Sequence, residues 1–180
     1  MKKLVLIPAA LLAIATLASA QMDMGQDKSK RPSPPASASC KFSDGKMVKI
    51  DYSSPRAKGR KIFGGVVSYG EVWRTGANEA TTFVADTNVT VGGKAVPAGS
   101  YTLFTLPTTD AWTLIISKKT GEWGTDYPGE KEDLARAPMS GSKTSAPVQN
   151  FTIAFDQAGG KCTLRMEWEN TRAKVEITEK

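Results

Sequence analysis

The segment Val72–Thr82 gathers side chains that are suited to binding a polar ligand. The Trp73 indole could stack on a sugar ring or another planar group, and the Arg74 guanidinium could bind a carboxylate or phosphate through two parallel hydrogen bonds. Asn78 and Glu79 could bind hydroxyl groups. A structural interpretation is also open, in which Trp73 lies in the core, Arg74 pairs with Glu79, and Asn78 caps a turn.

Basic side chains are concentrated just before this segment. The stretch from Arg56 to Lys61 holds four basic residues in six positions, among them Arg60, which could contact an anion. The chain has a net charge of +6 but shows no zinc-finger spacing, homeodomain-like helix or ribonucleoprotein aromatic motif. We therefore expect no nucleic-acid partner and favour an anionic or glycan component of a cell envelope, such as a lipopolysaccharide phosphate. The alternative is that the basic stretch is a solvated loop.

A third candidate segment, Thr120–Gly129, carries two aromatic residues in a loop that contains glycine. Trp123 and Tyr127 could touch a ligand if this loop lies at the rim of a β-fold. The alternative is a loop that is held in place by a buried Trp123.

Catalysis is restricted by composition, because none of the 180 residues is a histidine. A Ser-His-Asp triad, a histidine-ligated zinc ion and an imidazole acid–base step are therefore excluded. We predict no cofactor and no metal site, and we favour a binding or structural module over an enzyme. The enzymatic alternative is a glycan hydrolase with Glu79 as acid or nucleophile and Asp126 or Asp86 as its partner, which requires two carboxyl groups about 5–9 Å apart.

The elements that would position these side chains are strands. Apolar and polar residues alternate in several stretches, which is typical of half-buried antiparallel strands. The clearest are residues 47–52, 112–117, 151–155, 162–169 and 172–178, with a bend expected at Asn170. Gly92-Gly93 indicates a two-residue hairpin turn. The one helical candidate is Glu130–Ala137, although Leu134–Met139 could equally be extended.

These patterns predict an all-β fold. We expect an antiparallel β-sandwich, jelly-roll-like, with about 8–10 short strands and at most one short helix. The chain contains two cysteines, Cys40 and Cys162, and the second shares a strand face with Leu164 and Met166. An even count in an exported chain favours a Cys40–Cys162 disulfide over two separate thiols.

The N-terminus has the features of an export signal. Lys2 and Lys3 precede an apolar stretch at 4–17, and Ala18-Ser19-Ala20 provides the small residues of a cleavage site before Gln21. The apolar run is too short to cross a bilayer, so we expect no integral membrane segment after cleavage. The predicted organisation is a signal peptide at 1–20, a disordered Pro/Ser-rich linker at 21–39 and one domain at 40–180 of a periplasmic or secreted protein.

Several motifs in this order resemble one known family. They are Gly59-Arg-Lys-Ile-Phe-Gly64, Val72-Trp-Arg-Thr-Gly-Ala-Asn-Glu79, Pro97-Ala-Gly-Ser-Tyr-Thr-Leu-Phe-Thr105, Gly121-Glu-Trp-Gly124 and Trp168-Glu-Asn-Thr-Arg172. The chain resembles the exported bacterial proteins of domain-of-unknown-function family 2911 from about Cys40 to Ile177. The resemblance implies an exported β-domain. It implies no reaction and supplies no catalytic residue.

Overall fold

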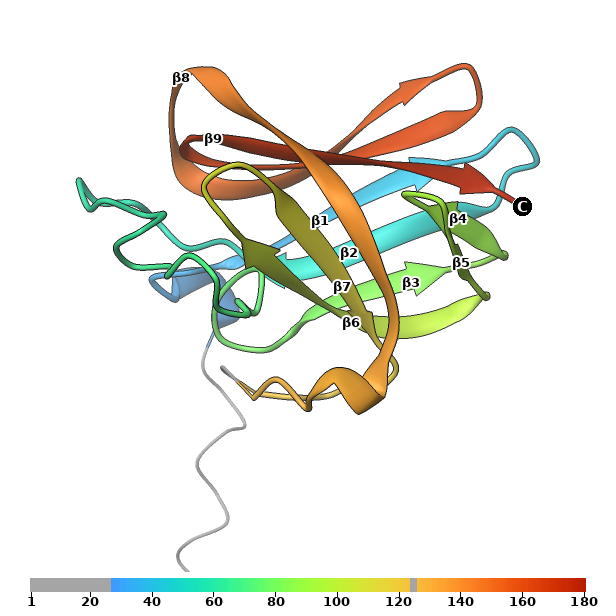
Figure 1. The fold of residues 1–180 in the computed structure, drawn as a ribbon, viewed down its shortest axis with the longest axis horizontal. Coiled ribbons are helices and arrows are strands. Elements are labelled where there is room, and N and C mark those ends of the chain that lie inside the picture. Colours follow the sequence, from blue (N-terminus) through green and yellow to red (C-terminus); the bar gives the residue numbers. More distant parts are fainter. Residues whose placement is uncertain (1–26, 124–125) are drawn as a thin grey trace, which may run out of the picture.

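The protein is built from nine antiparallel strands that form one hydrogen-bonded sheet (Figure 1). The computed structural model describes residues 27–123 and 126–180. The strand order is β1-β2-β3-β6-β7-β8-β9-β4-β5. The strands are β1 (Pro35–Lys41), β2 (Met47–Ser53), β3 (Thr81–Ala85), β4 (Val89–Val91), β5 (Lys94–Val96), β6 (Gly99–Pro107), β7 (Trp112–Ser117), β8 (Asp133–Ala158) and β9 (Lys161–Glu179).

Two short 3-10 turns, η1 (Lys28–Lys30) and η2 (Glu130–Glu132), accompany the strands. The helical candidate at 130–137 is helical only in η2, and the chain is extended from Asp133 onward. Alternate residues Ala135 and Ala137 point into the core, which is the period of a strand rather than of a helix. The extended alternative is the correct one.

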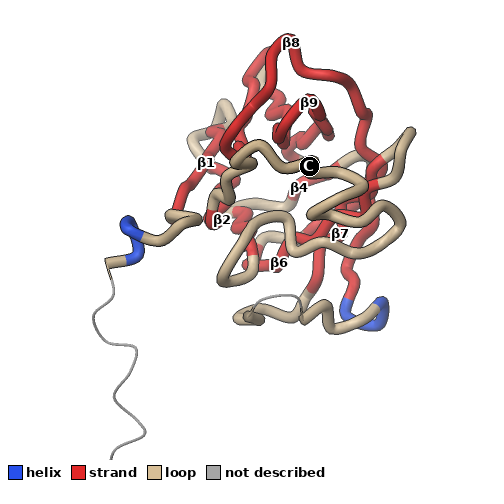
Figure 2. Tube along the Cα trace, turned by 90° about the vertical axis from the view of Figure 1, so that its left-hand side faces the viewer, coloured by secondary structure: helices blue, strands red, loops and turns tan. Residues whose placement is uncertain are grey.

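The long strand β8 determines how the sheet folds. Its first part, up to Met139, pairs with β7, and its part from Ser140 onward pairs with β9. Figure 2 shows β8 rising beside β7 and then passing over β9. The predicted all-β antiparallel fold is confirmed. Hydrogen bonding nevertheless runs without a break from one half of the sheet to the other, because β8 belongs to both.

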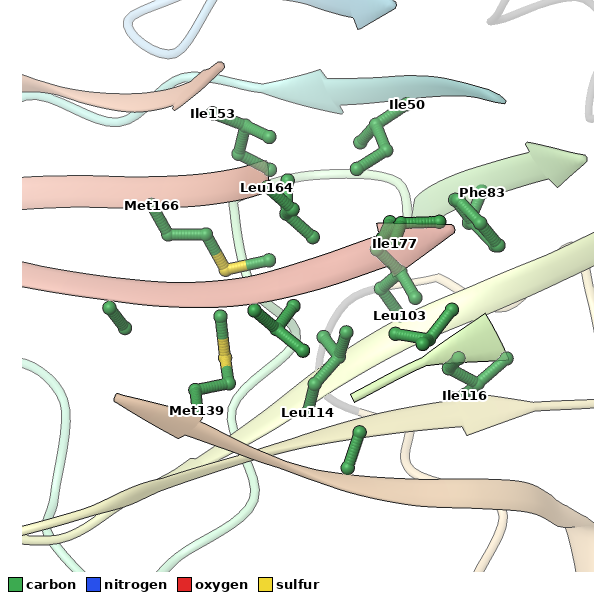
Figure 3. Close-up of a cluster of buried hydrophobic side chains, with 14 of the residues drawn as sticks. Ile50, Phe83, Leu103, Leu114, Ile116, Met139, Ile153, Leu164, Met166 and Ile177 are labelled. Carbon is green, nitrogen blue, oxygen red and sulfur yellow. The ribbon is translucent and has the colours of Figure 1, made fainter. Parts of the chain in front are cut away.

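The core lies between these two halves of the sheet. Ile50 and Leu114 from one half meet Leu164 and Ile177 from the other, and all four side chains are almost completely buried (Figure 3). These side chains are buried because apolar and polar residues alternate along the strands, so that every second residue of β7 and β9 faces inward. Burying this apolar surface is the main favourable contribution to folding.

The last strand is longer than the sequence patterns predicted. The alternating runs at 162–169 and 172–178 belong to a single strand, β9, and the bend expected at Asn170 does not end it. The local irregularity falls one residue earlier, where Glu169 adopts a left-handed φ of 53°. Pairing with β8 resumes at Thr171 after a register shift, so β9 is hydrogen-bonded to β8 on both sides of the irregularity.

The hairpin prediction is confirmed, since Gly92 and Gly93 join β4 to β5 with φ values of 53° and 82°. A tight two-residue hairpin needs positive φ at both positions, which glycine adopts without steric cost.

The predicted linker at 21–39 needs a correction at its end. Strand β1 begins at Pro35 and pairs with β2, so residues 35–39 belong to the sheet. Ala36 and Ala38 pack against the core, and their small size kept this strand from showing a strong apolar pattern. The predicted signal peptide at 1–20 and residues 21–26 lie outside the described residues.

The predicted disulfide is confirmed and links the first strand to the last. Cys40 in β1 and Cys162 in β9 are bonded, with their Cα atoms 6.0 Å apart and a separation of 122 positions in sequence. Closing so long a loop restricts the unfolded chain and stabilises the fold by roughly 4–5 kcal/mol in the chain-entropy treatment. Within the described ranges, no helix is both long and apolar enough to cross a membrane.

Candidate ligand-binding site

Trp73 lies in a cluster of aromatic rings. Its backbone pairs with Thr105, donating an N–H bond of 2.8 Å and accepting one of 2.9 Å. The indole stacks on Trp168 with ring centroids 5.8 Å apart and meets Phe151 edge-on at 4.9 Å. Ring packing of this kind stabilises a core beyond the area that it buries. The half-buried Trp73 indole is therefore packed against interior aromatic rings.

The turn that follows Trp73 is fixed by buried hydrogen bonds. Thr75 is fully buried with a left-handed φ of 56°, a costly conformation for a β-branched residue. Its hydroxyl donates to Thr105 at 3.1 Å, and its carbonyl accepts from the Thr81 hydroxyl at 2.8 Å. A Cβ atom on Gly76 would lie 2.9 Å from the Thr81 hydroxyl, so no larger residue fits there. The Arg74 Nε donates to the carbonyl of Gly76 at 3.2 Å.

Glu79 is bound by two cations of the N-terminal segment. Its Oε1 accepts hydrogen bonds from Arg31 at 2.8 Å and from Lys28 at 3.0 Å. Arg74, the partner suggested by the sequence, forms no ion pair with it among the described residues. Partial burial of Glu79 opposes ionisation, but the bonds from Arg31, from its own backbone and from Lys28 outweigh it and lower its pKa to about 2. Glu79 is therefore ionised at neutral pH and cannot act as a general acid.

The acids named as partners for Glu79 give no support for hydrolysis. Asp86 and Glu79 flank opposite ends of the strand β3, a separation of roughly 20 Å at about 3.3 Å per residue. The paired carboxyl groups of a glycosidase lie about 5–9 Å apart. Asp126 is exposed, three residues after Trp123. Within residues 27–123 and 126–180, no cluster of three or more acidic or cysteine side chains could hold a metal ion.

Asn78 connects the turn to the N-terminal segment. Its side-chain amide donates to the carbonyl of Ser33 at 3.0 Å. Asn78 has a φ of 58°, a left-handed conformation that asparagine tolerates better than most residues. Together, Asn78 and Glu79 fix residues 28–33 against the fold.

Ser33 forms one wall of a surface pocket of about 350 Å³, which we call the basic pocket. Its lining residues are Pro32, Ser33, Pro55, Arg56, Lys58 and Arg60. Arg60 is oriented by the backbone, since its Nε donates to the carbonyl of Ala57 at 3.0 Å and its Nη2 donates to the carbonyl of Arg56 at 2.7 Å. Arg56 donates to the Ser54 hydroxyl at 3.2 Å.

Among the described residues, no acidic side chain lines the basic pocket. No described acidic side chain lies within ion-pair distance of Arg56, Lys58 or Arg60. Backbone hydrogen bonds hold the segment that carries these cations. The N–H of Ala57 donates to the carbonyl of Gln149 at 2.7 Å, and the backbone of Arg56 forms an isolated β-bridge with Asn150 of β8. Three positive groups are thus positioned around an open volume that an anion could occupy.

Trp123 and Tyr127 have different environments. Trp123 is 58% exposed, and its backbone bridges that of Glu79. The Tyr127 ring packs edge-on against Phe104 at 5.2 Å, and its hydroxyl is 2.9 Å from the Asp133 carboxylate. Burial and the neighbouring Asp133 raise the pKa of Tyr127. Tyr127 therefore helps to hold its own loop over β6.

The structure divides the seven candidate residues into two groups. Arg60 lines the basic pocket, Asn78 holds one of its walls, and Glu79 lies beside Trp123 and holds the adjoining segment. Trp73, Arg74 and Tyr127 bond or pack within the fold.

A comparison with known families matches residues 33–177 to the family described as protein of unknown function (DUF2911). The chain belongs to this family. No curated protein and no solved structure shows a significant match to it.

The pocket residues that sequence reasoning missed are Pro32, Ser33 and Pro55, and Arg31 and Lys28 were missed as partners of Glu79. Four of these five lie in the stretch that was predicted as a linker. The only local signal was the group of three cations, Lys28, Lys30 and Arg31, beside prolines and serines, which a mobile tail would show equally. The family match begins at Ser33, within this stretch.

Proposed function

We propose that this protein is a non-catalytic binding module for anionic groups and that it acts outside the cytoplasm on an anionic or glycan component of the cell envelope. The observation that carries the proposal is the basic pocket, where three cations surround about 350 Å³ without an acidic partner among the described residues. The groups that match it are phosphates and carboxylates.

The electrostatics of the pocket favour a bound anion. Positive charges that are held close together repel one another, and a phosphate or carboxylate relieves that repulsion. Guanidinium groups bind such anions through pairs of parallel hydrogen bonds. Because the backbone already orients Arg60, less conformational freedom is lost when a ligand binds.

The candidate residues receive roles that follow from their contacts. Arg60 contacts the anion, with Arg56 and Lys58. Asn78 and Glu79 position the N-terminal wall of the pocket, and Trp123, whose backbone bridges that of Glu79, offers an exposed ring. Trp73, Arg74 and Tyr127 stabilise the fold through their internal contacts.

The location outside the cytoplasm is supported by the Cys40–Cys162 disulfide. Structural disulfides persist in oxidising compartments and are rare in the reducing cytosol. The export signal predicted at the N-terminus is in agreement with this location.

Titration calorimetry with polyphosphate and polygalacturonate tests the proposal. We expect binding that weakens as salt is raised and that falls at least about tenfold in the double variant Arg56→Gln/Arg60→Gln. Lys94→Gln/Lys143→Gln is the control for net charge, because both lysines are exposed cations outside the pocket, on β5 and β8. Failure of both polyanions to bind, or an equal loss in the control, would refute the proposal.

A further inference from the structure

The loop that carries the basic pocket also exposes large apolar side chains. Val66 is 49% exposed and Tyr69 is 42% exposed, and Trp123 is the one other large apolar residue with comparable exposure in the described part of the chain. Residues 56–71 lie beyond the ends of the strands, in the teal and green segment on the left of Figure 1.

Local geometry forces these side chains outward. Val66 donates to the carbonyl of Lys61 at 3.2 Å, and Gly64 donates to Val67 at 2.8 Å, which closes a tight turn. A Cβ atom on Gly65 would lie 2.4 Å from the Lys61 carbonyl oxygen, so the turn needs glycine there. Val67 points inward and is buried, and its neighbour Val66 is therefore left outside.

Tyr69 and Lys61 lie close together at the same turn. A Cβ atom on Gly64 would be 2.9 Å from the Tyr69 ring and 3.6 Å from the Lys61 Nζ. An aromatic ring and an ammonium group thus lie close together on the exposed turn that also carries Val66.

The charge of this loop is strongly positive. Residues 56–71 contain Arg56, Lys58, Arg60 and Lys61, against one acid, Glu71. None of the four cations forms an ion pair among the described residues. The Glu169 carboxylate of β9 accepts a hydrogen bond from the backbone N–H of Ile62 in this loop at 3.1 Å. Exposed apolar side chains beside cations that form no ion pair are complementary to a surface that offers both phosphate and hydrocarbon.

We propose that the loop 56–71 docks on an anionic lipid surface, with a lipid phosphate in the basic pocket and with Val66 and Tyr69 in the interfacial layer. This inference rests on the proposed function and names its ligand as the phosphate of a lipid headgroup. Tyrosine is favoured at membrane interfaces because its ring is apolar and its hydroxyl is hydrated. Lysine and arginine gain attraction from anionic lipids within a Debye length of the surface.

Vesicle sedimentation tests this docking with two preparations, one of phosphatidylglycerol and phosphatidylcholine and one of phosphatidylcholine alone. We expect the protein to bind the first preparation and not the second. Val66→Ser/Tyr69→Ser should weaken vesicle binding by at least about tenfold, because it removes the apolar contact. The same variant should keep its affinity for soluble polyphosphate, whereas Arg56→Gln/Arg60→Gln should lose both. Both apolar residues are exposed, so their replacement leaves the fold intact.

The outcomes separate this inference from the proposed function. Polyphosphate binding without vesicle binding would overturn the docking and leave the anion site standing, whereas loss of both would overturn both. Vesicle binding that is unchanged in Val66→Ser/Tyr69→Ser would reduce docking to surface charge and refute the role of the apolar turn. Concentration-dependent dimers that disappear in this variant would show instead that the turn contacts a second copy of the chain.

Discussion

The charges on β9 and those of the basic pocket are arranged in opposite ways. On β9, the nearly buried Glu167 carboxylate lies between Arg165 and Arg172. Arg165 also binds Asp156 on β8 through its Nε at 2.9 Å. We call these four residues the β9 charge cluster. In the basic pocket, by contrast, the guanidinium groups bond to backbone carbonyls and a hydroxyl.

The aromatic side chains show the same contrast. Trp73 and Trp168 pack within the fold, whereas Tyr69 of the loop 56–71 and Trp123 are exposed. Groups whose interactions are satisfied internally contribute to stability, and removing one leaves its partners unpaired. Groups that are left unsatisfied contribute little to stability and are available to a ligand.

The largest effect should come from removing the covalent link between β1 and β9. We expect Cys40→Ser/Cys162→Ser to lower the free energy of unfolding by roughly 4 kcal/mol, because the unfolded chain regains the freedom of a long loop. Urea denaturation measures this loss. Polyphosphate affinity should be unchanged in the folded variant, since neither cysteine lines the pocket. A loss below about 1 kcal/mol would contradict the chain-entropy argument.

Replacement of tryptophan should distinguish the interior from the rim. We expect Trp73→Ala to lower the free energy of unfolding by about 3 kcal/mol, because it removes contacts with Trp168 and Phe151 and leaves a cavity. The matched control Trp123→Ala should change it by no more than about 0.5 kcal/mol. Thermal or urea unfolding compares the two. Equal losses would show that Trp123 is also a structural residue.

The β9 charge cluster should be more sensitive than an exposed acid on the same strand. We expect Glu167→Gln to lower the free energy of unfolding by about 2 kcal/mol, less than for a fully buried pair because Arg165 and Arg172 keep some contact with water. Glu176→Gln, which removes an exposed ion pair with Lys161, should cost about 0.5 kcal/mol or less. If Glu167→Gln lowered the free energy of unfolding by less than Arg60→Gln, the β9 charge cluster would contribute less to stability than the basic pocket, contrary to this expectation.

The smallest effect should be the pH dependence of Glu79. Its pKa falls from 4.5 to about 2 on folding, so its stabilising effect is present above pH 4.5 and is lost as the pH falls toward 2. The side chain is 37% exposed, so solvent screening reduces the contribution to about 1 kcal/mol. Glu79→Gln should therefore be less stable than the parent at pH 7 and equally stable near pH 2 in denaturant titrations. A difference that is constant with pH would exclude this ion pair as its cause.

Much of the fold could be predicted because alternation is a local signal. Residues 112–117 and 162–169 carry inward-facing apolar side chains at every second position, and both are strands. Gly92-Gly93 specified a hairpin because few residues other than glycine tolerate its backbone angles. Strand β1 was missed because Ala36 and Ala38 are too small to give a clear apolar pattern.

The candidate site was predicted less well, because its geometry depends on segments distant in sequence. Arg60 was chosen for its chemistry and does line a pocket, but Pro32 and Ser33 complete that pocket from 28 and 27 positions earlier. Trp73 and Arg74 were chosen for the same kind of reason, yet their contacts lie within the fold. Residue type alone does not show whether a side chain faces a ring, a carbonyl or water.

The sequence by itself determined the all-β class, the alternating faces and the pairing of the two cysteines. These follow from the two-residue period of extended backbone and from the presence of only two sulfur atoms able to pair. The tertiary structure decided which charges are neutralised. It brought Arg31 to Glu79 across 48 residues and left Arg56, Lys58 and Arg60 without an acid among the described residues. The physical reason is that ion pairing requires contact within a few ångströms, and contacts between distant segments exist only after the sheet has folded.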